Sequence, residues 1–314
     1  MRAVTIQEGK LVVDERPDPE PARGELVVGV RAAGLNGADM LQLRGAYPAP
    51  PGSPPDIPGL ELAGEVVALG PDAQRFEVGD RVMAVVGGGG QAELAVVHER
   101  AAMPVPEPLD WPEAGGLPEV FTTAHDAIFT QAGLRPGEHL LVHGAAGGVG
   151  TAAVQLGRQA GARVTATVRR EELREGVERL GADEVIAPDG FGEHGPYDVV
   201  LELVGASNLE ENLSSLAIGG RIAVIGVGGT GPKGEINLHF LMIKRARIHG
   251  STLRARPLEE KAIAMRLVEK EVLPLFEDGR LSVPVAETFP LDDVEQAYSR
   301  FQAGGNLGKL VLLT

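Results

Sequence analysis

The spacing of apolar residues changes near residue 111 of the chain. Before that point, short apolar runs are separated by Gly, Pro and Asp, a pattern that predicts a mostly β region. The expected strands are 2–6, 11–14, 25–33, 64–69 and 81–86, with a short helix over 38–44. Beyond residue 111 apolar residues recur at helical intervals, first over 120–130, and strands then alternate with helices.

This second region predicts a parallel sheet with helices on both faces. The expected strands are 139–144, 163–168, 184–187, 197–204, 221–227 and 246–252, and the expected helices are 149–160, 171–180, 208–217 and 237–244. The strands are almost continuously apolar, as in a doubly wound sheet that is buried on both sides. The remaining pattern is a helix over 258–273, a strand over 285–289, a helix over 291–303 and a strand over 309–313. We therefore expect an α/β domain inserted between two parts of a β-rich domain.

Composition and charge narrow the classes of partner. A chain of 314 residues with 43% hydrophobic residues is long enough for about two domains. Its net charge of −15 disfavours non-specific binding to nucleic acid or to an anionic membrane. The absence of cysteine excludes disulfides, thiolate zinc sites and cysteine nucleophiles, and it fits a cytoplasmic protein. We see no signal-peptide core and no transmembrane run, so we expect no membrane partner. Because of the negative net charge, we also expect no nucleic acid partner.

The strongest chemical signal is the stretch HLLVHGAAGGVGTAAVQLGRQAG, over residues 139–161. It predicts a buried strand, a glycine turn and a helix, which is the context of a dinucleotide-binding loop. Glycines in such a turn let the backbone approach a pyrophosphate, and the helix N-terminus offers free N–H groups. An ordinary glycine-rich turn is the alternative. The residues expected to contact the cofactor here are Gly144, Ala146, Gly147, Gly148 and Val149.

The next expected strand bears on the choice of cofactor. NAD sites usually place an acidic residue at its end, about 20 residues beyond the glycine motif, where it binds the ribose 2′-hydroxyl. Here the strand ends in Val168-Arg169-Arg170, without an acid. Two guanidinium groups suit a 2′-phosphate, so the sequence favours NADPH. The alternative is that both arginines are solvated and begin a helix with Glu171 and Glu172.

The order of elements resembles the medium-chain dehydrogenase/reductase superfamily. The segments LNGADMLQLRGAYPAPPG, IPGLELAGEV, LPEVFTTAHDAI, LVHGAAGGVGTAAVQL and NLGKLVL are similar to its zinc-free quinone oxidoreductase branch. The resemblance implies a GroES-like catalytic domain over 1–118 and 253–314, with an inserted Rossmann domain over 119–252. It also implies NADPH in the cleft between the domains, and a homodimer formed by pairing of an edge strand at 247–252.

The sequence differs from the zinc-dependent relatives at a position that determines whether a metal can take part in the reaction. Zinc alcohol dehydrogenases of this superfamily have Gly-His-Glu where this chain has Gly59-Leu60-Glu61. Leucine cannot ligate a metal, and the cysteines of the zinc sites are missing. We therefore expect a zinc-independent reaction, with Glu61 as a structural carboxylate.

Several residues match cofactor-binding positions of the family. Asn36 and Thr123 match positions near the nicotinamide amide, and Gly226, Val227 and Gly228 match a backbone approach to the ring. Asn306 and Lys309 fall in a stretch that packs near the cofactor in relatives. The alternatives are a turn asparagine, a helix-bonded threonine, a simple turn after a strand, and residues that stabilise the C-terminal turn.

The candidate substrate residues are Tyr47 and Arg254. Tyr47 begins a proline-rich loop and matches a tyrosine that lines the substrate cleft in relatives, so with Asn36 it is the catalytic candidate. It could stack on a quinone or donate a hydrogen bond; packing is the alternative. Arg254 could reach the same cleft or form a surface salt bridge. We interpret His125 and His143 as structural histidines.

These features predict an NADPH-dependent, zinc-independent quinone oxidoreductase. A quinone is already electrophilic, so proximity and orientation are sufficient for catalysis. The first alternative is an enoyl or α,β-unsaturated carbonyl reductase, which needs a proton donor, with Tyr47 as the candidate. The second is a nucleotide-binding protein with little turnover.

Overall fold

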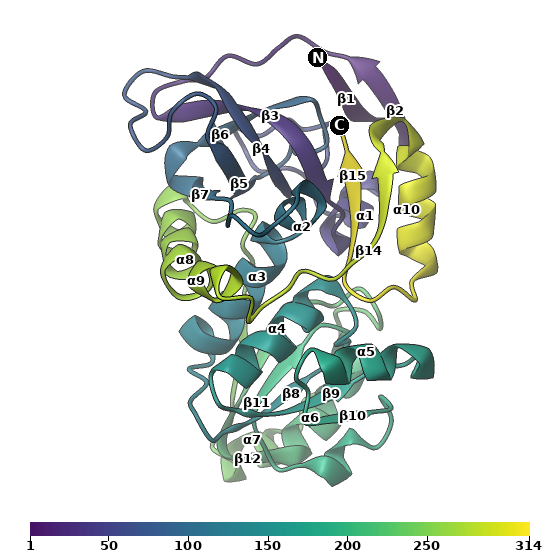
Figure 1. Cartoon of the computed structure of the whole chain (residues 1–314). Helices are drawn as coiled ribbons and strands as arrows, with labels where there is room; N and C mark the ends of the chain where they lie inside the picture. The colour runs from purple at the N-terminus through teal and green to yellow at the C-terminus, as the bar shows by residue number, and fades with distance from the viewer. The chain divides into compact units, whose positions relative to one another are not determined.

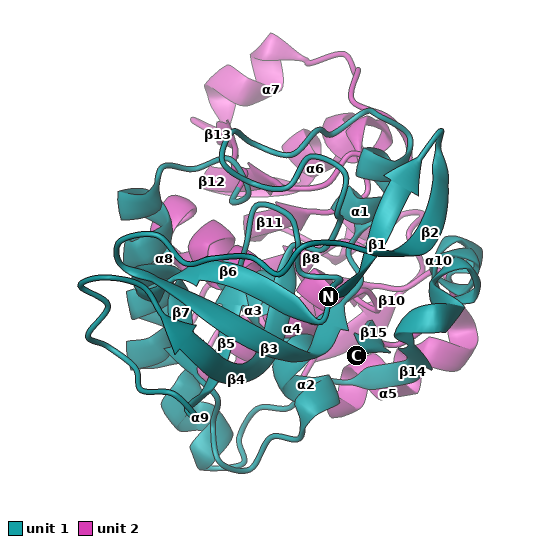
Figure 2. Cartoon of the chain, turned by 90° about the horizontal axis from the view of Figure 1, so that it is seen from above, with its two compact units in different colours: residues 1–122, 253–304, 309–314 teal, residues 123–252, 305–308 magenta.

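The computed structural model describes residues 1–314, and the chain divides into two compact units (Figures 1 and 2). Unit 1 comprises residues 1–122, 253–304 and 309–314, and unit 2 comprises residues 123–252 and 305–308. The expected boundary at residue 119 lies four residues later in the structure, inside one continuous helix. The expected assignment of 253–314 to one domain also needs a correction, because 305–308 packs in unit 2.

Unit 1 is built on a seven-stranded sheet with the order β14-β15-β3-β4-β5-β7, in which β6 also pairs with β3. A separate hairpin is formed by β1 and β2. The strands are β1 (Arg2–Gln7), β2 (Lys10–Glu15), β3 (Glu25–Gly34), β4 (Glu61–Leu69), β5 (Arg81–Val85), β6 (Leu94–His98), β7 (Ala102–Pro104), β14 (Val285–Pro290) and β15 (Lys309–Leu313). The helices are α1 (Gly37–Leu43), α2 (Trp111–Gly115), α3 (Pro118–His125), α8 (Leu258–Glu271), α9 (Leu273–Glu277) and α10 (Val294–Ala303).

The register of this sheet brings distant residues together. β15 runs antiparallel to β3 and pairs Val311 with Gly34, so Lys309 at the start of β15 lies beside the residues that follow β3. β4 begins at Glu61 and also pairs with β3. The sheet therefore places the end of β3, the start of β4 and the start of β15 at one edge.

Unit 2 is a six-stranded sheet, parallel throughout, with the order β10-β9-β8-β11-β12-β13. Its strands are β8 (His139–Val142), β9 (Arg163–Thr167), β10 (Glu184–Ile186), β11 (Tyr197–Glu202), β12 (Leu216–Val224) and β13 (Arg247–Gly250). Its helices are α4 (Gly148–Gln159), α5 (Arg174–Arg179), α6 (Leu209–Ser215) and α7 (Leu238–Ile243). The predicted fold class is confirmed. Because the strand order reverses between β8 and β11, ligands are expected at the carboxyl ends of these strands.

The observed helices and strands differ from the predicted ones in three places. β6, β7 and α2 were not predicted, because each has only three to five residues, too few to show a clear period. The expected helix over 120–130 continues from α3 into a wider turn over Asp126–Gln131 with π-helical bonding. The expected strand over 246–252 ends at Gly250. No helix in the structure is both long enough and apolar enough to cross a bilayer.

Candidate functional site

The glycine turn of unit 2 has the geometry that an anion-binding loop needs. β8 ends at Val142, and α4 begins at Gly148 with Gly147 as its N-cap. Gly144 adopts a φ of +61°, which favours glycine. A Cβ on Gly150 would lie 2.6 Å from the Cα of Ala145, so the turn and the helix approach too closely for any side chain. The N–H groups of the first turn of α4 have no intrahelical partners and are available to a phosphate.

The histidine that precedes this turn is structural, as predicted from its position. His143 is 1% exposed, and its ring nitrogens contact Thr167 Oγ1 at 3.2 Å and Asn212 Oδ1 at 2.8 Å. Asn212 donates in turn to Glu202 Oε2 at 2.9 Å. Burial lowers the pKa of His143, so the neutral ring is favoured at physiological pH. This network anchors the strand ends behind the loop.

Both candidate arginines lie exposed just beyond β9. The residue that directly follows the strand is Val168, which is 2% exposed and offers no carboxylate. The guanidinium of Arg170 packs against the backbone of Gly305 and approaches Glu172 Oε1 at 3.7 Å. A further guanidinium was missed in the sequence: Arg174 begins α5, and its Nε donates to the carbonyl of Val168 at 3.4 Å. The unit therefore presents three arginines, Arg169, Arg170 and Arg174, around the end of β9.

The glycines at 226–228 differ from one another. A Cβ on Gly226 would lie 2.5 Å from the carbonyl oxygen of Leu203, so this glycine is required by the neighbouring backbone of its own unit. Gly228 has no atom within 4 Å of a Cβ position, and Val227 is 38% exposed. A close approach to a ligand is therefore possible along 227–228, whereas Gly226 is explained by packing.

A buried polar cluster occupies the sheet edge of unit 1. The Nζ of Lys309 lies 2.6 Å from Glu61 Oε1 and donates to Asn36 Oδ1 at 2.8 Å and to the carbonyl of Leu35 at 2.6 Å. The amide of Asn36 donates to Glu61 Oε1 at 2.9 Å. Lys309 is 3% exposed and Glu61 is fully buried. An ammonium group has three donors, and all three are occupied here, which gives Lys309 a structural role in this cluster. Its contact with the cofactor stays a prediction.

Asn36 is held by several partners. Its amide nitrogen donates to Glu61 and to the carbonyl of Gly34 at 3.2 Å, and its Oδ1 accepts from Lys309. Its side chain is also part of the capping box at the start of α1. Asn36 is 9% exposed, so these partners fix its side chain, and its contact with the nicotinamide amide stays a prediction.

Glu119 is a functional candidate that the sequence analysis did not identify. Its backbone N–H donates to Glu61 Oε2 at 2.8 Å, while its own Oε2 is buried without a hydrogen-bond partner. Burial and the charge of Glu61 raise the pKa of Glu119 to about 8. At neutral pH this carboxyl group therefore holds a proton. Its only signal in the sequence was an acid after a proline at a helix start.

Asp39 behaves in a similar way within the same cluster. It accepts the backbone N–H groups of Asn36 at 2.8 Å and Gly59 at 3.2 Å, which fixes α1 against the segment before β4. Burial raises the pKa of Asp39 to about 7 despite these two bonds.

Arg254 and Tyr47, the two candidate substrate residues, are neighbours in unit 1. Arg254 is 1% exposed, and it donates to the carbonyl of Gly87 at 2.7 Å, to that of Tyr47 at 2.8 Å and to Gln42 Oε1. Its guanidinium lies 5.1 Å from the centre of the Tyr47 ring. These three bonds make Arg254 a support of the Tyr47 loop, and its contact with a substrate stays a prediction.

The Tyr47 side chain is partly exposed and lies in the electrostatic field of Glu119. Burial and the Glu119 charge raise the pKa of Tyr47, while Arg254 opposes the shift. Lys261 of α8 senses the same carboxyl group: burial lowers the pKa of its ammonium, and Glu119 acts to raise it. The charge of Glu119 therefore acts on both the Tyr47 phenol and the Lys261 ammonium group of unit 1.

Thr123 and Asn306 are the last two residues that were expected to contact the cofactor. Thr123 is partly exposed on α3. The amide of Asn306 donates to the carbonyl of Gly308 at 2.8 Å, which closes a turn. The structure contains no group of three or more His, Cys, Asp or Glu residues arranged to hold a metal ion.

Comparison with known proteins identifies a separate family model in each of the two main parts of the chain. A family model described as the alcohol dehydrogenase GroES-like domain matches residues 22–107, and one described as zinc-binding dehydrogenase matches residues 148–270. The quinone oxidoreductase of Homo sapiens is 33% identical, with 100% of this chain and 98% of that protein aligned.

Solved structures show the same similarity. A probable oxidoreductase from Mycobacterium abscessus is 32% identical with a TM-score of 0.86, over 100% of this chain and 99% of that one. An NAD-dependent alcohol dehydrogenase is 28% identical with a TM-score of 0.88, over the whole of both chains.

Proposed function

We propose a function from one premise: the chain belongs to the quinone oxidoreductase type of the medium-chain dehydrogenase/reductase family. It is an oxidoreductase of the kind that uses a nicotinamide cofactor. Beyond this premise, our proposal is that NADPH is the reductant, that a quinone is the acceptor and that the reaction needs no zinc. A cytoplasmic homodimer is part of the same proposal.

The arginines after β9 carry the choice of NADPH. Arg169, Arg170 and Arg174 surround a strand end that has no carboxylate to bind a 2′-hydroxyl. A guanidinium binds a phosphate by charge-assisted and often bidentate hydrogen bonds. The residues of unit 2 also fit the pyrophosphate part of the cofactor, because the glycine turn before α4 offers N–H groups to a pyrophosphate. When bound, the nicotinamide supplies a hydride from its C4 atom.

The residues of unit 1 support a reaction by positioning. Leu60 stands where zinc relatives have a ligand, and it is 1% exposed. Glu61 and Lys309 satisfy one another and hold Asn36 in one orientation, so the oxygen of Asn36 can orient an amide. The proposal assigns Tyr47 to the quinone, as a ring to stack on or a hydroxyl that donates to an oxygen. Proximity and orientation then account for the rate.

The test is a matrix of two cofactors and several acceptors. Purified protein is incubated with NADPH or NADH and with 1,4-benzoquinone, 9,10-phenanthrenequinone, an enone, an enoyl-CoA or a simple aldehyde. Loss of reduced nicotinamide absorbance is then followed. The proposal predicts rapid loss of NADPH with the quinones. No oxidation with any quinone at any pH would refute it.

A second candidate is favoured by the protonated carboxyl group near Tyr47. Reduction of an α,β-unsaturated carbonyl needs a proton at the α-carbon, and Tyr47, whose pKa is raised by burial and by the charge of Glu119, is the candidate source. Removing a general acid typically costs 10²- to 10⁴-fold in rate, by order of magnitude. We expect Tyr47→Phe to lower enone turnover by about 100-fold and quinone turnover far less. Unchanged enone turnover would exclude this mechanism, and tight NADPH binding without any turnover would favour a binding protein instead.

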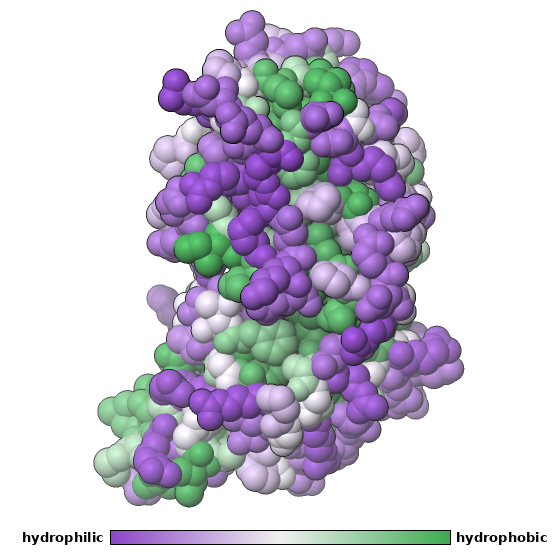
Figure 3. Space-filling view, turned by 60° about the vertical axis from the view of Figure 1, so that its left-hand side comes forward, coloured by the Kyte–Doolittle hydropathy of each residue, from purple (hydrophilic) through white to green (hydrophobic).

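The proposed homodimer uses the free edge of the unit 2 sheet. β13 pairs only with β12, so its outer edge has open backbone groups. Leu238 and Met242 of α7 are 66% and 67% exposed. Figure 3 shows apolar side chains gathered at the lower left, toward the end of the molecule where Figure 1 places α7. A second copy of the chain would cover both features.

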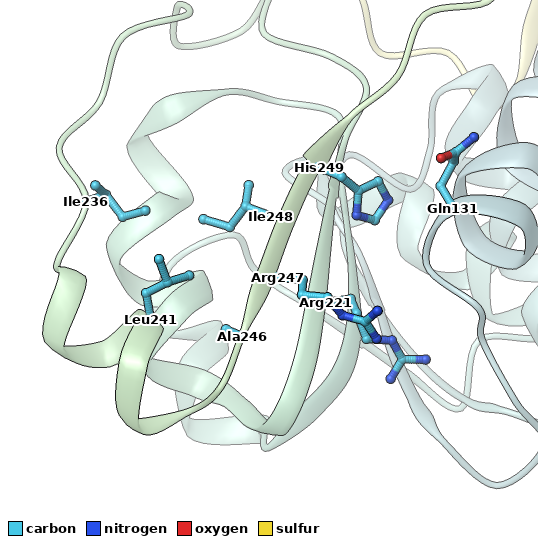
Figure 4. A pocket seen from close by; sticks show the side chains of 8 residues that line it. All are labelled: Gln131, Arg221, Ile236, Leu241, Ala246, Arg247, Ile248 and His249. Atoms are coloured by element: carbon cyan, nitrogen blue, oxygen red, sulfur yellow. The ribbon is translucent and has the colours of Figure 1, made fainter.

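A hollow beside β13 belongs to the same surface. Figure 4 shows Ile236, Leu241 and Ile248 around it, with Arg247 and His249 along the strand. Light scattering at several concentrations tests the dimer. We expect a dimer for the natural protein and a monomer for Met242→Glu combined with Leu238→Glu. A monomeric natural protein would contradict it.

A further inference from the structure

The segment 305–308 returns the chain to unit 2 just before its last strand. Its flanking residues, Gly304 and Lys309, belong to unit 1. The segment has only four residues, yet it makes three separate contacts within unit 2. Each of these contacts is with an element that the proposed function assigns to the cofactor or with a direct neighbour of such an element.

The first contact is with the glycine turn. The backbone N–H of Gly308 donates to the carbonyl of Ala146 at 2.8 Å, and Gly308 forms a parallel bridge with Gly147. Asn306 closes the turn by donating to the carbonyl of Gly308. The return segment is thereby fixed against the loop that offers its N–H groups to a pyrophosphate.

The second contact is with α5. The side chain of Leu307 packs on Gly176 so closely that a Cβ there would lie 2.6 Å from Leu307 Cδ2. Gly176 is buried, and it lies two residues after Arg174. This contact fixes the segment next to the helix that follows the two candidate arginines.

The third contact is with Arg170 itself. Gly305 adopts a φ of +75°, and a Cβ on it would lie 2.4 Å from Cζ, 2.5 Å from Nη1 and 2.7 Å from Nε of Arg170. The guanidinium therefore packs directly on the Gly305 backbone, in space that any side chain would fill. The Arg170 side chain remains 44% exposed, so it is supported on one side and accessible on the other.

We propose that the return segment 305–308 determines cofactor preference, because Gly305 holds Arg170 in the orientation that binds a 2′-phosphate. The proposal rests on the proposed use of NADPH and adds a residue that does not contact the phosphate. An arginine side chain loses conformational freedom when it binds, and support in the bound orientation reduces that loss. The ligand class is a 2′-phosphorylated adenine nucleotide. Gly305 is thus a positioning residue.

The decisive variant is Gly305→Ala, with Gly304→Ala as its matched control. Both glycines have a positive φ, +75° and +63°, but a Cβ on Gly304 has no atom within 4 Å. The control therefore adds the same methyl group at a similar positive φ without displacing Arg170. Binding of NADP⁺, NAD⁺ and adenosine 2′,5′-bisphosphate to the full chain is measured by titration calorimetry.

We expect Gly305→Ala to weaken NADP⁺ and the bisphosphate about tenfold and NAD⁺ less than twofold, on the scale of one partly lost charge-assisted bond. Gly304→Ala should leave all three unchanged. In an Arg170→Ala background, Gly305→Ala should have no further effect. Equal weakening of NADP⁺ and NAD⁺, or no weakening of NADP⁺, would overturn the proposal.

Two further variants separate the possible failures. If Gly305→Ala does not fold, Leu307→Ala loosens the same segment without backbone strain, and it should weaken NADP⁺ more than NAD⁺. Arg169→Ala combined with Arg170→Ala tests the underlying use of NADPH. If this pair leaves the NADP⁺ to NAD⁺ ratio unchanged, the NADPH proposal fails. If the ratio falls for the pair but not for Gly305→Ala, only the role of Gly305 fails.

Discussion

The two units present their candidate residues in opposite ways. Unit 2 offers backbone N–H groups at a glycine turn and arginines beyond β9 whose side chains are exposed. Unit 1 offers a buried cluster in which Lys309, Glu61 and Asn36 satisfy one another. The difference shows that a charged side chain near a candidate site can be assigned a role only when its burial and its bonding partners are known. The exposed arginines are candidates for binding a ligand, whereas the buried lysine stabilises the fold.

The same contrast predicts where each substitution acts. A buried ion pair that loses one partner leaves an uncompensated charge, so it affects stability strongly. An exposed arginine at a strand end contributes little to stability, and its loss is expected to affect binding. Each of the following experiments tests one side of this division.

The largest effect is expected from Lys309→Met. It removes the ammonium group and leaves the fully buried Glu61 carboxylate without its cation. We expect unfolding free energy to fall by about 3–5 kcal/mol, as measured by urea denaturation. The exposed Lys10→Met serves as the control, with a change of at most about 0.5 kcal/mol. Equal effects of the two substitutions would show that the cluster is not structural.

The next effect concerns binding through the arginines. Arg169→Ala combined with Arg170→Ala removes two guanidinium groups from the proposed 2′-phosphate site. We expect the Kd of NADPH to rise about 100-fold, since hydrogen bonds to charged groups contribute about 1.5–3 kcal/mol each. Binding of NADH and the urea midpoint should be unchanged.

The matched control for these arginines is Arg163→Ala. Arg163 is also exposed on β9, but it lies at the first residue of the strand, at the opposite end. If its loss weakens NADPH as much as the double substitution does, the effect is general electrostatics rather than a specific site.

A smaller effect is expected in the pH dependence of stability. The pKa of Glu119 is about 8 in the folded chain and 4.5 for an ordinary glutamate, so the folded state binds the proton more tightly. Its contribution is fully present below about pH 4.5 and is lost as pH rises through about 8. The groups that set this pKa by their charge are Glu61, Lys309, Asp39 and Lys261.

Glu119→Gln tests this directly. We expect the loss of thermal stability between about pH 5 and about pH 8 to be shallower than in the natural protein. Part of the slope remains, because Asp39 also has a raised pKa, of about 7. Glu20→Gln, at an exposed position, should leave the slope unchanged. A slope in Glu119→Gln that equals the natural one would contradict the protonated carboxyl group.

The parts of the candidate site that are local in the chain could be predicted from the sequence. The glycine turn and the helix after it occupy one continuous stretch, and the arginine pair follows the next strand directly. The helical and strand periods also predicted both sheets and the inserted domain. Short strands such as β6 and β7 carry too few alternating residues to be recognised.

The missed features depend on contacts between distant residues. Lys309 and Asn36 are 273 positions apart, and their contact follows from the pairing of β15 with β3. Arg254 reaches Gln42 across 212 positions, which no local pattern shows. Glu119 gains its raised pKa from burial beside Glu61, and its sequence position indicated only a helix start. Burial and partners, which the sequence does not display, separate a ligand-binding charge from a structural one.

The central claim is that this chain oxidises NADPH with a quinone and selects NADPH through exposed arginines. The most direct measurement is the ratio of kcat/KM for NADPH to that for NADH, with 1,4-benzoquinone as acceptor. The account predicts a ratio above about 10, which corresponds to at least about 1.4 kcal/mol of selectivity. A ratio near one, or no oxidation of either cofactor, would contradict it.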